Sequence, residues 1–373
     1  MGTIKQNRAN NILTSGKLDA TDGLNNNVPA TNIGNASLSN VTSYPPSSGT
    51  GVSSVASDPP SPNEGQIWYN TTSGALKQYS LLTGSWSSGG SLNTQRTTSG
   101  FGTQTAAIAA GGFDYPPNLN TTAVESYNGT AWTTVNSLNS ARRETGEAGT
   151  QPAGLVFGGI GPFPSPTSSG SGENESWDGT NWTEVADLNS ARYQNSGAGT
   201  QTAALTFGGT PFPVSAATES WNGTSWTSVN SLNTGRSYMG ATGTQTAAIT
   251  AAGDTNNPHP TKVANVESWD GTSWTEVTDV NTIRAGLAGA GIQTDAIIFG
   301  GGTPAPGTTG NTESWNGTAW TEVNNLATAR SALGGDGTSS SALAFGGYPG
   351  SWPATTVTEE WTQGLSVQTI TAS

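Results

Sequence analysis

The stretch Glu219-Ser-Trp-Asn-Gly-Thr-Ser-Trp-Thr-Ser-Val229 occurs in five close copies and decides the fold of this chain. Each copy is expected to form two short aromatic strands joined by Asn-Gly-Thr or Asp-Gly-Thr, because these dipeptides supply the positive φ angles of a tight hairpin turn. Two aromatic side chains five positions apart can pack together around that turn. One such hairpin is marginal in water, so we expect the tandem copies to cover one another in a repeat fold. The other copies span 125–135, 175–185, 267–277 and 313–323.

Each aromatic hairpin ends a longer repeat, which is clearest at residues 192–229. The repeat begins at an arginine and continues through a small-residue strand and an apolar strand that ends in Gly-Gly. A variable, proline-rich loop then leads to the hairpin. Four short strands in each 44 to 50 residues match the period of a β-propeller blade. The leading arginines are Arg96, Arg142, Arg192, Arg236, Arg284 and Arg330, and the second tryptophans of the hairpins are Trp132, Trp182, Trp226, Trp274 and Trp320.

The repeated residues are interpreted as structural. Glycine and alanine in the first strand suit a crowded propeller axis. The arginines and the glutamate of Glu-Ser-Trp occur in nearly matched numbers, so we expect each arginine to bond that glutamate or backbone carbonyls. The tryptophans are interpreted as core side chains. Asp178 and Asp270 stand where other repeats have asparagine, so this position is chosen for its turn and not for a glycan.

The recurring order of di-glycine, aromatic residue, tryptophan and arginine resembles the kelch repeat over residues 79–361. The resemblance implies an all-β, closed propeller of about six blades, with seven blades as the alternative. The last repeat lacks a second tryptophan. We expect residues 364–370 to supply its final strand and residues 67–86, which include a predicted hairpin and Trp86, to add strands to the same blade. Pairing both ends of the chain there would remove open sheet edges.

The composition argues against several classes of function. A net charge of −13 argues against nucleic-acid binding. The chain has no cysteine, no apolar stretch as long as a transmembrane helix, and no signal-peptide core at its start, so we expect folding in a cytoplasm and no membrane insertion. His259 is the only histidine, which leaves no Ser/His/Asp set and a poor metal site. We therefore expect no catalytic residue, no cofactor and no metal.

Residues 1–62 differ from the rest of the chain. They are rich in Asn, Ser, Thr and Gly, with few apolar residues, and they end in proline-rich stretches. Such a segment cannot bury a core of its own, so we expect an N-terminal anchoring arm and linker that packs on another chain. Residues 63–373 are expected to form the propeller.

The repeats differ most in the loop between their second and third strands. In a four-stranded antiparallel blade this loop lies on the same face as the linker between blades, so all six loops are expected to crown one face. Prolines and exposed aromatic residues offer contact area at a low entropic cost of binding. We expect this face to bind a partner such as a surface polysaccharide. The candidate ligand-binding residues are Phe113, Tyr115, Phe163, Phe212, His259, Tyr348 and Trp352.

The chain as a whole is similar to virion fibre proteins of marine bacteriophages. The similarity lies in the order of a polar arm, the motif Asn63-Glu-Gly-Gln-Ile-Trp-Tyr-Asn70 and Gly-Thr-Gln-Thr-Ala-Ala repeats. The resemblance implies a structural virion component of a tail fibre, nozzle or capsid fibre, assembled in the host cytoplasm. It would be attached to other virion proteins through residues 1–62, form homo-oligomers and display the propeller to the host. The alternative is a cellular kelch-type lectin or protein-interaction scaffold.

Overall fold

The computed structural model describes residues 52–63, 65–81, 83–114, 119–161, 170–210, 213–255, 261–305 and 307–370. Over these residues every element is a strand, and no helix is long and apolar enough to cross a membrane. The chain divides into two compact units, Gly84–Thr362 and a smaller one made of Met1–Thr83 with Gln363–Ser373. This boundary differs from the one predicted at residue 63. Most of the expected arm, residues 1–51, lies outside the described residues.

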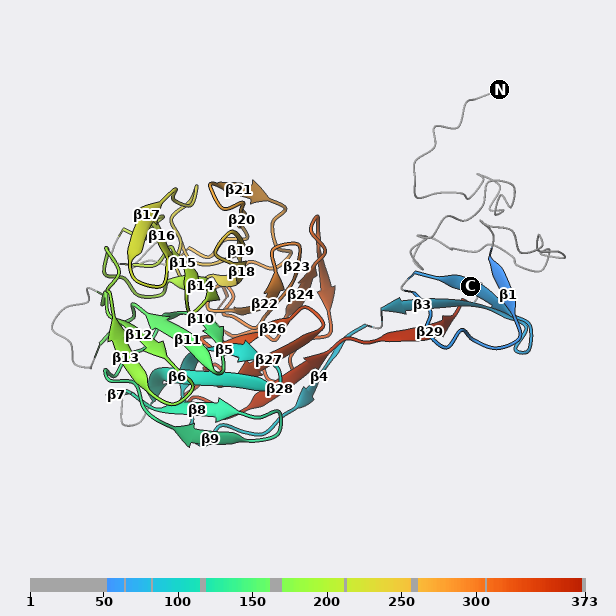
Figure 1. The fold of residues 1–373 in the computed structure, drawn as a ribbon, viewed down its shortest axis with the longest axis horizontal. Coiled ribbons are helices and arrows are strands. Elements are labelled where there is room, and N and C mark those ends of the chain that lie inside the picture. Colours follow the sequence, from blue (N-terminus) through green and yellow to red (C-terminus); the bar gives the residue numbers. More distant parts are fainter. Residues whose placement is uncertain are drawn as a thin grey trace, which may run out of the picture. The chain divides into compact units, whose positions relative to one another are not determined.

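The larger unit is built from short antiparallel strands in repeated sheets (Figure 1). In one sheet β10 (Gly146–Thr150), β11 (Ala153–Phe157), β12 (Asn174–Trp177) and β13 (Trp182–Val185) pair in chain order. The same order recurs in β14 (Ser196–Thr200), β15 (Ala203–Phe207), β16 (Thr218–Trp221) and β17 (Trp226–Val229); in β18 (Gly240–Thr244), β19 (Ala247–Ala251), β20 (Val266–Trp269) and β21 (Trp274–Val277); and in β22 (Ala288–Ile292), β23 (Asp295–Phe299), β24 (Thr312–Trp315) and β25 (Trp320–Val323).

Two further sheets complete this unit. The first contains β5 (Thr97–Thr103), β6 (Ala106–Asp114), β8 (Val124–Tyr127) and β9 (Trp132–Val135), with β7 (Leu119–Asn120) paired to β6 beside them. The last contains β26 (Gly334–Thr338), β27 (Ser341–Phe345), β28 (Thr358–Thr362) and β4 (Ser85–Ser88).

The first strand of each sheet lies at the centre of this unit (Figure 1). β5 contacts β10, β10 contacts β14, and the series continues through β18, β22 and β26 back to β5. Small residues allow this close approach. A Cβ atom on Gly197, for example, would lie 2.2 Å from the carbonyl oxygen of Glu147 in the adjacent sheet. Sheets that radiate from one axis in this way form a β-propeller.

The last blade is completed by a strand from the start of the chain. β4 pairs with β28 and places Trp86 opposite Trp361, with ring centroids 5.5 Å apart. The expectation that residues 364–370 supply this strand was wrong, because β29 (Leu365–Thr369) pairs with β3 (Ala75–Leu81) in the smaller unit. The expectation that residues 67–86 add strands to this blade holds only for β4, because residues 67–70 and 75–81 belong to the sheet of the smaller unit. The physical reason is that Trp86 restores the tryptophan pair that the other hairpins contain, whereas β29 has no aromatic residue.

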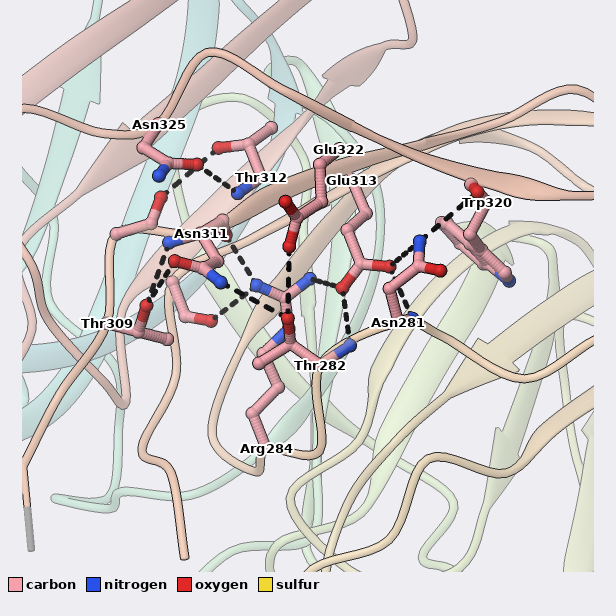
Figure 2. Close-up of polar contacts among 12 residues, drawn as sticks. Asn281, Thr282, Arg284, Thr309, Asn311, Thr312, Glu313, Trp320, Glu322 and Asn325 are labelled. Carbon is pink, nitrogen blue, oxygen red and sulfur yellow. Dashed lines mark hydrogen bonds and ion pairs between the residues drawn. The ribbon is translucent and has the colours of Figure 1, made fainter. Parts of the chain in front are cut away.

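A buried arginine and glutamate hold the start of each blade, and Figure 2 shows the pair Arg284–Glu313. Arg284 donates to Glu313 Oε1 at 3.0 Å and to the carbonyl of Asn311, and both charged side chains are 0% exposed. Glu313 also accepts hydrogen bonds from the backbone amide and side chain of Asn281 in the preceding linker. The pair therefore ties the linker to the third strand of its blade. The other pairs are Arg96–Glu125, Arg142–Glu175, Arg192–Glu219, Arg236–Glu267 and Arg330–Glu359.

A glutamine in the turn after every inner strand except β26, where Ser339 takes its place, joins neighbouring blades at the opposite end. Gln201 donates to Ser176 Oγ at 3.0 Å and to the carbonyl oxygen of Trp177 in the preceding blade. The indole nitrogen of Trp221 donates to the backbone carbonyl of Gln201 at 3.0 Å, which fixes the turn. Gln151, Gln245 and Gln293 make the equivalent contacts.

Replacing Gln201 with alanine is expected to lower the free energy of unfolding by about 1–2 kcal/mol, because two hydrogen bonds between blades are lost and a partly buried carbonyl is left unsatisfied. Thr202→Ala, at the exposed neighbouring position, is the control and should change stability by less than about 0.5 kcal/mol. Denaturant unfolding followed by tryptophan fluorescence measures both. Equal stability of the two variants would contradict the joining role of Gln201.

The smaller unit contains the sheet β1-β2-β3-β29, with β1 (Ser53–Val55) and β2 (Ile67–Asn70) at its start. β2 and β3 form the predicted hairpin. Trp68 is 0% exposed, and its indole nitrogen donates to Asp58 Oδ1 at 2.9 Å, as does the Asn70 amide at 2.7 Å. These bonds from Asn70 and Trp68 lower the pKa of Asp58. This sheet joins strands from the two ends of the chain.

Candidate functional site

The loops between the second and third strands lie beside the linkers that enter the blades. Backbone bridges join Arg143 to Ile160 and Tyr193 to Thr210, for example. Because each linker enters at the same end of its inner strand, the described parts of these loops lie at that end of the propeller, which we call the loop face. The other bridges between a linker and the loop of its blade are Ser237–Asp254, Ala285–Gly302 and Ser331–Tyr348.

Three of the predicted ligand-binding residues lie together on the loop face. The rings of Phe113 and Trp352 meet edge to face with centroids 5.3 Å apart, and those of Trp352 and Tyr348 lie 5.0 Å apart. The guanidinium carbon of Arg143 lies 4.7 Å from the Phe113 ring centroid. We call these four residues the aromatic stack. It joins the first blade, the last blade and the linker into the second.

Trp352 is the most accessible ring of the aromatic stack, at 39% exposed, while Phe113 and Tyr348 are half-buried. Arg143 is held beside Phe113 by donating to Asn120 Oδ1 at 2.8 Å. The stack is therefore a fixed surface feature with one open aromatic face. The other predicted ligand-binding residues lie outside the described residues; these are Tyr115, Phe163, Phe212 and His259.

A chain of backbone hydrogen bonds runs most of the way around the axis on the loop face. The amide of Gln194 donates to the Glu144 carbonyl at 2.7 Å, and that of Tyr238 donates to Gln194 at 3.0 Å. Gly286 then donates to Tyr238, and Ala332 to Gly286, each at 2.8 Å. All five residues have φ between 49° and 68°, a left-handed conformation that costs non-glycine residues about 1 kcal/mol each. We call this chain of bonds the backbone arc.

The backbone arc is open at the first blade. Thr98 occupies the corresponding position without a positive φ, and β5 carries a register shift beside it. The aromatic stack lies at this opening. Arg143 precedes Glu144 at one end of the arc, and Tyr348 pairs with the linker residue before Ala332 at the other. The aromatic stack thus lies where the regular repeat of the ring is interrupted.

A central cavity of about 250 Å³ lies along the inner strands, and its lining includes Glu144 of the backbone arc and two carboxyl groups on inner strands. Glu147 on β10 accepts a hydrogen bond from Thr145 Oγ1 at 2.7 Å. Asp336 on β26 accepts from the backbone amides of Gly102 at 2.9 Å and Gly337 at 2.6 Å. β10 and β26 are the two inner strands on either side of β5, so both carboxyl groups belong to the irregular part of the ring.

Both carboxyl groups hold protons more tightly than free carboxylates. Burial, assisted by the charge of Asp336, raises the pKa of Glu147 to about 8. Hydrogen bonds from Thr145 and Ser99 act in the opposite direction. Burial raises the pKa of Asp336 to about 7, opposed by its two amide donors. At the cavity mouth, burial and the nearby Glu144 raise the pKa of Tyr238. At neutral pH Glu147 is therefore mostly protonated, and Asp336 is near the midpoint of its titration.

Sequence reasoning missed Glu147 and Asp336. The sequence could have indicated them, because each is a charged residue in a strand of otherwise small residues. The strand 196–200 has Gly197 at the position of Glu147 and Ala198 at the position of Asp336. Among the residues that the structure describes, no group of three or more His, Cys, Asp or Glu side chains is arranged to hold a metal ion.

The repeated sheets and their arrangement place the chain in the class of all-β propeller proteins. No protein-family model matches it, and no curated protein matches its sequence. Among solved structures the chain is similar to YjhT, a kelch-type β-propeller, with a TM-score of 0.62 and 13% sequence identity over 76% of this chain and 100% of that one. At this identity the similarity shows the fold alone.

Proposed function

We propose that the chain is a structural virion protein that displays its propeller for binding to a host-surface polysaccharide. In this proposal residues 1–62 attach to other virion proteins, and the chain forms homo-oligomers in a particle assembled in the host cytoplasm. The motif over residues 63–70, which is similar to virion fibre proteins, supports the attachment through residues 1–62. Its last four residues form β2, and β2 belongs to the same unit as the start of the chain.

The aromatic stack is the observation that carries the binding function. Trp352 offers an open ring that Phe113 and Tyr348 hold in place, so little side-chain entropy is lost when a ligand packs on it. An aromatic face is complementary to the C–H face of a sugar ring. Arg143, held in place by the buried Asn120, puts a charged group beside the rings that can donate to ligand hydroxyl groups. This combination of apolar face and polar rim is typical of ligand sites.

We also infer six blades for the propeller. In the described residues, six sheets carry the buried Arg–Glu pair, and their inner strands form one closed series of contacts. The remaining sheet, β1-β2-β3-β29, belongs to the smaller unit and shows no such pair in its described part.

The proposal assigns no catalytic residue, cofactor or metal. Glu147 and Asp336 are the acid–base candidates, because raised carboxyl pKa values often mark active sites. However, hydrogen bonds from inner-strand groups hold both, and the exposed ring of Trp352 lies on the loop face. Screening glycosidase and lyase substrates tests this view. Cleavage by the wild-type protein that Glu147→Gln or Asp336→Asn abolishes would overturn it.

Replacing Trp352 with alanine is expected to weaken binding of the full-length protein to host cells or to a glycan array about tenfold to thirtyfold, a typical loss at an aromatic binding hot spot. Phe113→Ala should weaken it less, because Phe113 supports the ring of Trp352. Ile292→Ala is the matched control, since Ile292 is an exposed apolar residue at the opposite end of its blade, 56% exposed. Unchanged binding in both aromatic variants would remove the aromatic stack from the proposal.

The virion assignment needs a separate test. An antibody raised against residues 84–362 should label intact phage particles in electron microscopy. If no particle is labelled and the protein is a free monomer in cells, the alternative of a cellular kelch-type lectin or scaffold is favoured. This result does not depend on whether the aromatic stack binds a glycan.

A further inference from the structure

β29 forms one edge of the sheet in the smaller unit. In the described residues it pairs with β3 alone. Its five residues include no charged residue and no proline, and Leu365 at its start is 38% exposed. Natural proteins usually protect an edge strand with charges, proline, a bulge or a very short strand, because unpaired N–H and C=O groups template pairing with another chain. β29 carries none of these protections.

The outer strands of the propeller differ from β29. Each is four residues long, and three of them carry an exposed glutamate that opposes edge-to-edge pairing. These residues are Glu184 on β13, Glu276 on β21 and Glu322 on β25. A protecting charge is therefore present on three outer strands of the larger unit and absent from β29, which is also one residue longer than any of the outer strands.

The register of β29 identifies the backbone groups that point away from β3. The amide of Ile370, the residue after β29, donates to the carbonyl of Leu76 on β3 at 2.9 Å. Hydrogen-bonded pairs alternate along an antiparallel ladder, so every second residue before Ile370 also bonds to β3. The residues between them direct their N–H and C=O groups outward; these are Leu365, Val367 and Thr369.

We infer that β29 pairs with β29 of a second copy of this chain, antiparallel about Val367. This two-fold pairing places Val367 opposite its equivalent and Leu365 opposite Thr369, so three outward pairs exchange about six backbone hydrogen bonds. The strand is uncharged, so the pairing brings no like charges together even though each chain carries a net charge of −13. This pairing is the contact that would form the homo-oligomer of the proposed function. It rests on the proposed function only for the expectation that the chain forms homo-oligomers.

Val367→Pro tests the inference, because proline removes the outward N–H of Val367 without removing a bond to β3. In light scattering the full-length wild-type protein should have twice the 37.8 kDa mass of one chain. Val367→Pro should have the mass of one chain, or a dimer dissociation constant at least tenfold higher. Val367→Thr keeps the N–H and is the matched control, expected to remain dimeric. A monomeric wild type, or a dimer that Val367→Pro leaves intact, overturns the inference.

A single cysteine gives an independent test, since the chain has none. In a hydrogen-bonded antiparallel pair the Cα atoms lie about 5.5 Å apart, a distance that a disulfide spans. Val367→Cys should therefore form a covalent dimer on oxidation, whereas Thr227→Cys on the outer strand β17 should not. If Val367→Cys stays monomeric while its amide is protected from hydrogen exchange, another segment of the same chain covers the edge and the inference is wrong.

The outcomes separate this inference from the proposed function. If the wild type is monomeric but its binding to host cells requires Trp352, the dimer contact fails and the binding function stands. If Val367→Pro separates a wild-type dimer but neither form binds host cells or glycans, the contact stands and the binding function fails.

Discussion

Replacing Arg236 with methionine is expected to lower the free energy of unfolding by about 3–5 kcal/mol, because the change leaves a buried carboxylate without its cation. Arg236 is 0% exposed, and its Nη2 lies 2.9 Å from Glu267 Oε1. Its Nη1 also donates to the carbonyls of Ala252 and Asn265, which lose their partner in the variant. Denaturant unfolding of the full-length protein, followed by tryptophan fluorescence, measures the loss.

Arg143→Met provides the comparison for Arg236→Met. Arg143 and Glu144 are 22% and 19% exposed and 3.3 Å apart, so this pair should contribute less than about 1 kcal/mol. Adding Glu267→Leu to Arg236→Met should recover only part of the stability, because Glu267 also accepts bonds from the amides of Asn233 and Thr234. Equal losses for Arg236→Met and Arg143→Met would contradict a structural role for the buried pair.

The stability of the propeller is expected to fall as the pH rises from about 5 to 9, and Glu147→Gln should remove much of this fall. Glu147 has a pKa of about 8 in the folded chain, against 4.5 for an ordinary glutamate, so the folded state holds a proton that the unfolded chain releases in this range. The full shift corresponds to about 5 kcal/mol. Since Glu147 is half-buried and solvent partly screens its charge, we expect about 2–3 kcal/mol.

Glu147→Gln should therefore stabilise the protein at pH 9 and leave its stability nearly unchanged at pH 4. Asp336→Asn should act in the same direction over a lower range, because its pKa is about 7. Glu184→Gln is the control, since Glu184 is exposed on an outer strand. A stabilisation by Glu147→Gln that is the same at pH 4 and pH 9 would contradict proton binding as its cause.

The propeller could be predicted because the same local pattern recurs. Asn-Gly-Thr and Asp-Gly-Thr turns define each outer hairpin, and the glycine-rich first strands suit only a crowded axis. The arginine and glutamate positions were also readable, since two opposite charges that recur together in apolar surroundings need each other when buried. These features depend on residues close together in one repeat.

Features that depend on closure of the ring could not be predicted. The repeat pattern predicted both the segment of Trp86 and residues 364–370 as partners for β28. Only the observed pairing of Trp86 with Trp361 decides between the two segments. Phe113 and Trp352 belong to the first and last blades and meet only when the ring closes. The open backbone arc depends on the conformation of Thr98, for which the sequence gives no clear signal.

Completion of the last blade by β4 has a consequence for synthesis of the chain. β4 leaves the ribosome about 270 residues before its partner β28. Until β28 appears, Trp86 has no hairpin partner, and the contact between β26 and β5 is absent as well. A prematurely terminated chain therefore cannot close the ring, and the blades at its two ends lack a neighbour. Proteolysis and aggregation remove such incompletely folded chains. Pairing of β4 with β28 therefore makes full-length translation a condition for a persistent propeller.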